Sequence, residues 1–164
     1  MIAQQLYIQT NENPKSCAFT GHRKPETTYP KAELKKQVKA LIAKGCLTFY
    51  CGMAQGFDLL AAKVVLKEKK RNGAVKLIAC VPCEEQDKYY PSTEKKAYRD
   101  LIKKADERVC LADKYYRGCM QARDRYMADK ADAMIAYLRK QTGGTAYTAG
   151  YFEKRYPYKP LIII

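Results

Sequence analysis

The sequence predicts an α/β fold: a Rossmann-like, three-layer domain with a mostly parallel sheet and helices on both faces. Short apolar runs alternate with stretches of helical periodicity along almost the whole chain of 164 residues. This alternation favours parallel pairing, because each helix then provides the crossover between two strands. No repeat, low-complexity tract or linker rich in Pro, Gly or Ser divides the chain. We therefore expect one domain over residues 1–164, with residues 1–15 as a lead-in segment.

The first half of the chain contains two predicted strand–helix pairs. The apolar runs CAFTG at 17–21 and LTFYCG at 47–52 are typical of buried strands. A helix follows the first strand, because a proline and a glycine bracket a stretch whose apolar residues recur with helical spacing: Leu34, Val38, Leu41 and Ile42. We place this helix over 31–44 and a second one over 59–69.

The second half continues the same alternation. The run VKLIACV at 75–81 predicts a strand that ends at Pro82, which cannot donate a backbone hydrogen bond to a neighbouring strand. The remaining strands are expected at the short apolar runs 108–112, 133–138 and 161–164. Helical patterns occupy the segments 92–105, 119–131 and 145–155.

The chain is strongly basic. Its 31 Lys and Arg residues oppose 17 Asp and Glu, which gives a formal net charge of +14. An excess of this size favours an anionic partner such as a nucleotide, a nucleic acid or a phosphorylated metabolite. Much of the excess flanks the apolar positions of predicted helices, where exposed side chains fall. A solvated, lysine-rich surface therefore accounts for most of the charge.

The sequence carries no sign of export or of membrane insertion. Its start lacks a basic segment followed by a long apolar core, and no apolar run approaches the roughly 18 residues that a membrane span needs. Seven cysteines, an odd number, are scattered along the chain. We therefore expect a cytoplasmic protein with free thiols and no membrane partner. Self-association is left open by the sequence.

We expect no metal site. Cys80 and Cys83 have CxxC spacing, but a four-thiolate zinc site would need a second such pair, and none exists. His22 is the only histidine, which excludes a site with several histidines. The cysteines are therefore interpreted as ordinary buried thiols, and no cofactor is required.

Polar and glycine-rich segments follow several predicted strands. They are TGHR at 20–23, GMAQGFD at 52–58, PCEEQ at 82–86 and TGGT at 142–145. In an open parallel sheet the carboxyl ends of the strands meet at one edge, and ligands bind there. The predicted ligand-binding residues, including two from the helix at 119–131, are Thr20, Gly21, His22, Arg23, Gly52, Met53, Ala54, Gly56, Asp58, Pro82, Gln86, Arg123, Asp124, Gly143, Gly144 and Thr145.

The glycines favour a ligand that carries phosphate. Gly52 and Gly56 would let backbone N–H groups approach it, and the helix that follows would direct its free N–H groups toward the same space. Gly143 and Gly144 repeat this arrangement before the last helix, with Thr145 as its N-cap or as a hydroxyl donor. Arg23 could bind phosphate in a bidentate manner. Neither GxGxxG nor a Walker A sequence occurs.

Two acids are candidate catalytic or ribose-binding residues. Asp58 begins a predicted helix, where it could cap the helix or accept hydrogen bonds from ribose hydroxyls. Asp124 shares an apolar helical stripe with Met120 and Met127, so it must form an internal salt bridge, with Arg123 for example, or face a cleft. For His22 we favour a role in loop structure over one as a catalytic base, because no orienting partner is evident.

Five motifs, in order, resemble the SLOG superfamily and most closely its YpsA-like branch: FTGHR, GMAQGFD, VPCEEQ, RDRYMADKADAMIAY and GGTAYT. They run through about residues 16–164. The resemblance implies a Rossmann-like fold that binds nucleotides or nucleotide-derived ligands. The superfamily includes the DNA-processing protein, which binds single-stranded DNA, and the Lonely Guy phosphoribohydrolases, which release a base from a nucleoside monophosphate. Other members have been proposed to sense ADP-ribose-like signalling nucleotides.

The Lonely Guy motif P-G-G-x-G-T-x-x-E is incomplete in this chain. The corresponding stretch is TGGTAYTAG, and Thr148 stands where the glutamate would be. Three functions therefore stay open. We favour a sensor or regulator that binds a small nucleotide-derived ligand, over a hydrolase of a nucleotide N-glycosidic bond and over a single-stranded nucleic-acid-binding protein. The net charge of +14 predicts weak, non-specific affinity for nucleic acid, and the 14 tyrosines could stack on bases.

Overall fold

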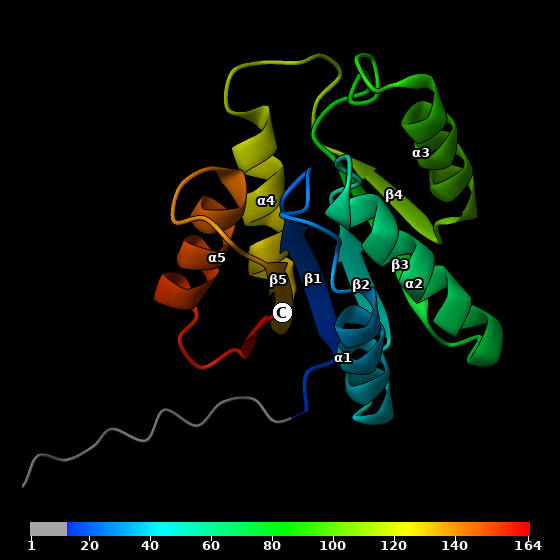
Figure 1. Cartoon of the computed structure of the whole chain (residues 1–164), viewed down its shortest axis with the longest axis vertical. Helices are drawn as coiled ribbons and strands as arrows, with labels where there is room; N and C mark the ends of the chain where they lie inside the picture. The colour runs from blue at the N-terminus through cyan, green and yellow to red at the C-terminus, as the bar shows by residue number, and fades with distance from the viewer. Residues whose placement is uncertain (1–12) are drawn as a thin grey trace, which may run out of the picture.

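The computed structural model describes residues 13–164, in which strands and helices alternate throughout (Figure 1). The residues expected to form a lead-in segment lie mostly outside this range. The elements, in chain order, are β1 (Ser16–Gly21), α1 (Lys31–Ala43), β2 (Thr48–Cys51), α2 (Phe57–Arg71), β3 (Lys76–Val81), α3 (Ser92–Lys104), β4 (Glu107–Cys110), α4 (Cys119–Lys130), β5 (Ala133–Tyr137), α5 (Gly144–Arg155) and β6 (Leu161–Ile163).

The strands form one parallel sheet with the order β4-β3-β2-β1-β5-β6. The predicted Rossmann-like α/β fold is therefore confirmed. In the centre of the sheet Cys17 of β1 lies opposite Phe49 of β2 on one side and Ala133 of β5 on the other. The chain builds the sheet outward from β1 to β4 and then crosses to β5. This reversal of direction at β1 and β5 is the position where open α/β sheets bind ligands.

The helices cover the two faces of the sheet in unequal groups (Figure 1). The helices α1, α2 and α3 pack in series on one face, and α4 and α5 pack together on the other. The alternation of side chains along β1 assigns its residues to these faces: Cys17 and Phe19 join the larger apolar cluster, whereas Ala18 joins the smaller one with Met127 and Phe152. Both faces of the central strands are buried, as a parallel sheet requires.

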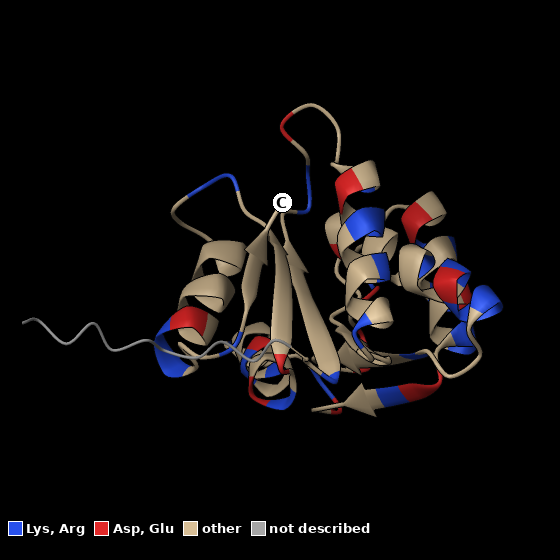
Figure 2. Cartoon of the chain, turned by 90° about the horizontal axis from the view of Figure 1, so that it is seen from below, with Lys and Arg blue, Asp and Glu red and all other residues tan. Residues whose placement is uncertain are grey.

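The charged side chains lie mainly on the helices and the loops. Figure 2 shows Lys and Arg on the helices of both faces, whereas the central strands carry few charges. This distribution agrees with the interpretation of most lysines as solvated helix positions. None of the helices between residues 13 and 164 is long and apolar enough to cross a bilayer.

Candidate functional site

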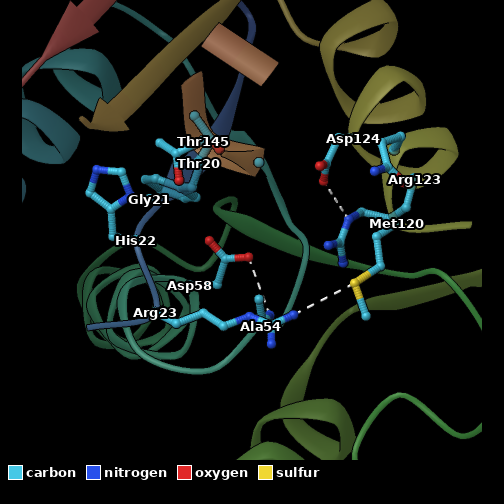
Figure 3. A pocket seen from close by; sticks show the side chains of 13 residues that line it. Thr20, Gly21, His22, Arg23, Ala54, Asp58, Met120, Arg123, Asp124 and Thr145 are labelled. Carbon is cyan, nitrogen blue, oxygen red and sulfur yellow. Dashed lines mark hydrogen bonds and ion pairs between the residues drawn. The ribbon is translucent and has the colours of Figure 1, made fainter. Parts of the chain in front are cut away.

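A cavity of about 330 Å³ opens at the carboxyl ends of β1 and β2, between the N-terminal ends of α2, α4 and α5 (Figure 3). We call it the edge cavity. Most of the residues that the sequence predicted for ligand binding line it: Thr20, Gly21, His22, Arg23, Ala54, Asp58, Arg123, Asp124, Gly144 and Thr145. They come from four separate segments of the chain. The topology thus brings together residues up to 125 positions apart, from 20 to 145.

The other predicted residues lie outside the lining of the edge cavity. Met53 is fully buried, and its φ of 58° is the only positive value of a non-glycine residue between 13 and 164. Gln86 is buried below the turn that follows β2, where its Nε2 donates to the carbonyl of Gly52 at 2.8 Å. Pro82 directly follows β3 and is not part of the lining, and Gly143 lines a neighbouring cavity.

Gly52 makes room for a side chain of the protein itself. A Cβ atom at this position would lie 2.8 Å from the Cζ atom of Arg123 and 3.0 Å from Oδ2 of Asp58. The guanidinium of Arg123 donates to the carbonyl of Gly52, and its Nη1 also lies 3.4 Å from the carbonyl of Cys80. The close approach that the sequence predicted at Gly52 is therefore made by arginine.

Gly56 is enclosed by the loop that follows β1. Its φ is +79°, and a Cβ atom there would lie 2.1 Å from the carbonyl oxygen of Arg23 and 2.2 Å from the hydroxyl of Tyr29. The N–H group of Phe57, the first residue of α2, donates to the carbonyl of His22 at 3.4 Å. Protein atoms thus fill the space beside both glycines, so the packing of the protein itself requires glycine there. Phosphate binding by the backbone of this turn stays a prediction.

The turn before α5 is open. A Cβ atom at Gly143 or at Gly144 would meet nothing within 4 Å among the described atoms. The N-cap of α5 is Gly143, with a φ of +95°, so Thr145 lies in the first helical turn rather than at the expected cap position. No acid occupies this first turn. The N-terminal end of α5 is thus the part of the edge cavity that can accept an anion through free N–H groups.

The helix α4 contributes an ion pair to the wall of the edge cavity, and the arginine of this pair is buried. The Nε of Arg123 lies 2.7 Å from Oδ1 of Asp124, and Arg123 is only 4% exposed. The hydroxyl of Thr148 lies 3.1 Å from Oδ2 of Asp124. The sequence placed Asp124 on the buried stripe of this helix, but the stripe runs through Cys119, Arg123 and Met127, and Asp124 is partly exposed. The internal salt bridge exists, and both of its members also line the edge cavity.

Asp58 is buried in the wall of the edge cavity. It lies in the first turn of α2, is 5% exposed, and accepts a hydrogen bond from the N–H of Ala54 at 3.2 Å through Oδ2. Its Oδ1 has no hydrogen-bond partner among residues 13–164. Burial raises the pKa of the Asp58 carboxyl to about 7, against the opposing effect of Arg123. Figure 3 shows Asp58 between the threonines of the cavity and Arg23.

His22 stabilises the loop that carries it. Its Nε2 accepts a hydrogen bond from the N–H of Arg139 at 2.8 Å, and its ring packs edge-on against Tyr137. Burial and the nearby charges of Lys140 and Arg139 lower the pKa of His22, so the ring is neutral at physiological pH. This geometry agrees with the structural role expected for this histidine.

The sequence prediction missed three residues of the edge cavity. Phe19 belongs to β1, and Met120 and Gln121 occupy the first turn of α4. Arg23 Nη2 lies 3.6 Å from the sulfur of Met120, so two lining residues of the cavity contact each other. Met120 and Gln121 are neither glycines nor charged residues, so the features used to predict the site do not include them. Only the expectation that the helix N-termini converge at this edge could have found them.

No cluster of three or more His, Cys, Asp or Glu side chains between residues 13 and 164 could hold a metal ion. All seven cysteines are free, and Cys80 and Cys83 are both buried. Burial is the main effect that raises the pKa of both thiols. The polar groups that line the edge cavity are two threonine hydroxyls, two arginines, two carboxylates, the imidazole of His22 and the amide of Gln121.

Known structures share this architecture. The structure of DNA processing protein A from Helicobacter pylori, described for its single-stranded DNA binding mode, matches 92% of this chain and 65% of its own with a TM-score of 0.65 at 22% identity. DNA processing protein A from Streptococcus pneumoniae matches 90% of this chain and 49% of its own, with a TM-score of 0.64 at 21% identity. The fold and the cavity define a Rossmann-like domain with its candidate site at the carboxyl edge of the sheet.

More specifically, the chain belongs to the YpsA family, described as the YspA SLOG family, whose model matches residues 14–160. It is 28% identical to the UPF0398 protein BH1768 of Halalkalibacterium halodurans, with 85% of this chain and 76% of that protein covered. It is 30% identical to the SPbeta prophage-derived protein YoqJ of Bacillus subtilis, with 77% of this chain and 81% of that protein covered. The resemblance to the SLOG superfamily and its YpsA-like branch is thus confirmed.

Proposed function

We propose that this protein binds a nucleotide or nucleotide-derived ligand in the edge cavity, as a sensor or regulator. The observation that carries the proposal is Oδ1 of Asp58, a buried carboxylate oxygen without a hydrogen-bond partner among the described residues, in the wall of the edge cavity. An unsatisfied buried acceptor is costly. Because this oxygen is itself covered, a ligand hydroxyl satisfies it once the carboxyl turns the oxygen toward the cavity. A ribose offers neighbouring hydroxyl donors at this position.

A phosphate attached to that ribose has a separate place to bind. Direct contact with Asp58 would be repulsive, whereas the first turn of α5 presents free N–H groups and lacks an acid. Thr145 lies in this turn, is 7% exposed, and its hydroxyl has no partner among residues 13–164. Arg23 is exposed on the opposite side of the cavity and can add a cation. The cavity thus offers a hydroxyl acceptor and an anion site, the two groups that a ribose phosphate needs.

The comparisons support the proposal at the level of ligand class. The H. pylori structure with the same fold comes from a protein described as binding single-stranded DNA, whose units are also sugar phosphates. Asp58 favours a second candidate, hydrolysis of the N-glycosidic bond of a nucleotide. A carboxyl with a pKa of about 7 in a cavity is suited to donate or accept a proton near neutral pH. In that case Asp58 would act on the departing base or on the attacking water.

The test is a titration of the protein with AMP, 2′-deoxy-AMP and ribose 5-phosphate, followed by calorimetry and by thermal shift at pH 8. A ligand present at 100 times its dissociation constant should stabilise the protein by about 2.7 kcal/mol. We expect Asp58→Asn to weaken AMP binding by roughly 1.5–3 kcal/mol, as for a lost hydrogen bond to a charged group. Asp100→Asn is the matched control, because Asp100 is an exposed acid on α3.

The outcomes separate the alternatives. Equal AMP affinity of the wild-type protein and Asp58→Asn would refute the role of Asp58. A failure of all three probes to bind, and of the dinucleotides NAD and ApA as well, would refute the proposed function. Release of free adenine during the incubation, lost in Asp58→Asn, would establish the hydrolase. Tight binding of a single-stranded oligonucleotide that persists above physiological salt would instead favour a nucleic-acid function.

A further inference from the structure

A second cavity of about 590 Å³ adjoins the edge cavity, and we call it the outer cavity. It lies between the N-terminal ends of α4 and α5, and its lining includes Tyr116, Arg117, Arg125 and Tyr147. The two cavities share Gln121 and Gly144 in their linings. A ligand that passes over the first residue of α5 therefore reaches both.

The outer cavity presents aromatic rings to solvent. Tyr116 is 49% exposed and Tyr147 is 42% exposed, although neither ring belongs to the apolar core. The position of Tyr147 is fixed on two sides: Nη1 of Arg125 donates to its hydroxyl at 3.0 Å, and its ring stacks on that of Tyr151 with centroids 6.4 Å apart. Exposed tyrosines held in place by neighbours offer preorganised surfaces for stacking.

Two glycines keep the backbone of the outer cavity uncovered. Gly118 precedes α4 with a φ of +94°, and Gly143 precedes α5 with a φ of +95°. A Cβ atom at either position would meet nothing within 4 Å of the described part of the chain. The first turns of α4 and α5 both lack acids, and Arg117 and Arg125 add positive charge. The junction between the two cavities is therefore suited to an anion, and the outer cavity to an aromatic group.

We propose that the ligand is a dinucleotide, in which a phosphodiester or pyrophosphate joins two nucleosides. Its phosphate lies at the start of α5, the ribose of one nucleoside reaches Asp58 in the edge cavity, and the base of the other stacks on Tyr147 and Tyr116 in the outer cavity. The inference rests on the proposed function and names its ligand class. A single nucleotide whose ribose and phosphate occupy the edge cavity leaves the outer cavity unused, whereas a second nucleoside beyond the phosphate enters it.

The experiment compares three probes by calorimetry: AMP, NAD as a pyrophosphate-linked dinucleotide, and the ribodinucleotide ApA as a phosphodiester-linked one. We expect one of the two dinucleotides to bind at least about 10-fold more tightly than AMP, and the preferred one identifies the linkage. Tyr147→Ala should weaken that dinucleotide about 10-fold and leave AMP within about twofold, because only the second base contacts this ring.

Two further variants control the result. Tyr147→Phe keeps the ring and loses only the hydroxyl that Arg125 contacts, so it should keep dinucleotide affinity within about threefold. Tyr89→Ala removes the most exposed tyrosine between residues 13 and 164, 86% accessible in the loop between β3 and α3, and should change nothing. An unchanged thermal midpoint of Tyr147→Ala without ligand checks that the variant is folded.

The failures of the two proposals are distinguishable. If AMP binds through Asp58 but neither dinucleotide binds more tightly, or if Tyr147→Ala behaves like Tyr89→Ala, the dinucleotide inference is overturned while the proposed function stands. If Tyr147→Phe loses as much affinity as Tyr147→Ala, stacking is not the interaction and the inference also fails. If no probe binds, both proposals fail.

Discussion

Two glycine-containing turns at the same edge of the sheet have similar sequence patterns, but the space beside their glycines differs in the structure. One follows β2 and contains Gly52 and Gly56; the other follows β5 and contains Gly143 and Gly144. Each leads from a strand into a helix. The first is closed, because side-chain and carbonyl atoms of the protein occupy the space beside its glycines, whereas the second has open space beside both. A glycine before a helix therefore does not by itself identify a ligand site.

The closed turn has a different function, which is to organise the wall of the edge cavity. Its carbonyl at Gly52 accepts hydrogen bonds from the buried side chains of Arg123 and Gln86. Its Ala54 N–H holds one oxygen of Asp58 and leaves the other free. The closed turn thus positions side chains, and the open turn exposes backbone. Substitutions at four positions test this difference, and they follow in order of their expected effect on stability.

The largest effect is expected at Gly56. Gly56→Ala introduces a Cβ atom 2.1 Å from a backbone carbonyl, in a conformation with a φ of +79°. The strain of that conformation and the overpacking together should cost roughly 3–5 kcal/mol. Chemical denaturation of the variant and the wild-type protein measures this loss. A loss below 1 kcal/mol would mean that the loop after β1 moves away easily and that the turn is not closed.

Asp58, which is held by the closed turn, should make the stability of the folded protein depend on pH. Its pKa is raised to about 7 in the folded protein, so the folded state holds a proton that the unfolded state releases at lower pH. Stability should therefore fall as the pH rises from about 4 to about 7, by something on the order of 2–4 kcal/mol. Asp58→Asn cannot ionise, so it should lose this part of the pH dependence. Urea unfolding at pH 5 and pH 8 measures the free energy of unfolding of both proteins. An equal change of this free energy between the two pH values in the wild-type protein and in Asp58→Asn would contradict the prediction.

The third effect concerns the contact between Gly52 and Arg123. Gly52→Ala places a Cβ atom 2.8 Å from the guanidinium carbon, which must shift within a buried hydrogen-bond network. We expect a loss of about 1–3 kcal/mol. Because Arg123 pairs with Asp124 beside the edge cavity, ligand affinity should fall in the same variant. Gly73→Ala is the control, since a Cβ atom at Gly73 meets nothing within 4 Å. Similar stabilities of the two variants would rule out the contact.

The sequence predicted the fold well because the fold depends on local patterns. Apolar runs and helical periodicity place each strand and helix, and their alternation makes the sheet parallel. The positions of Thr20, Asp58 and Thr145 around one cavity follow from that topology, since all lie at the carboxyl edge. The closure of the first turn could not be predicted, because it depends on Arg123 and Tyr29, which lie 71 and 27 positions from the glycines that they cover.

The burial of Arg123 shows a second limit of sequence reasoning. Hydrophobic periodicity assigns charged residues to the exposed face of a helix, yet Arg123 shares the buried stripe of α4 with Cys119 and Met127. It can do so because Asp124 and the carbonyl of Gly52 satisfy its charge and its donors. These partners come from a tertiary contact with the turn after β2. The burial of a charged side chain that depends on such tertiary partners cannot be predicted from the hydrophobic periodicity of the helix.

The smallest change in stability is expected at Gly144. In this open turn, a substitution should be able to weaken ligand binding without disturbing the fold. A Cβ atom there meets nothing within 4 Å, and the residue opens α5 as its first helical position. Alanine favours a helix over glycine by up to about 1 kcal/mol, so Gly144→Ala should be as stable as the wild-type protein or slightly more stable.

Gly144→Val should fold as well, but its side chain enters the space that the edge cavity and the outer cavity share. We expect it to weaken nucleotide binding at least about 10-fold, because the phosphate needs the exposed N–H groups of this turn. Thermal midpoints and calorimetric titration of the same samples separate the two effects. Full affinity in a folded Gly144→Val protein would show that the open turn is not the anion site. Unfolding of Gly144→Ala would show that its glycine serves the fold, as Gly56 does, and would remove the difference between the two turns.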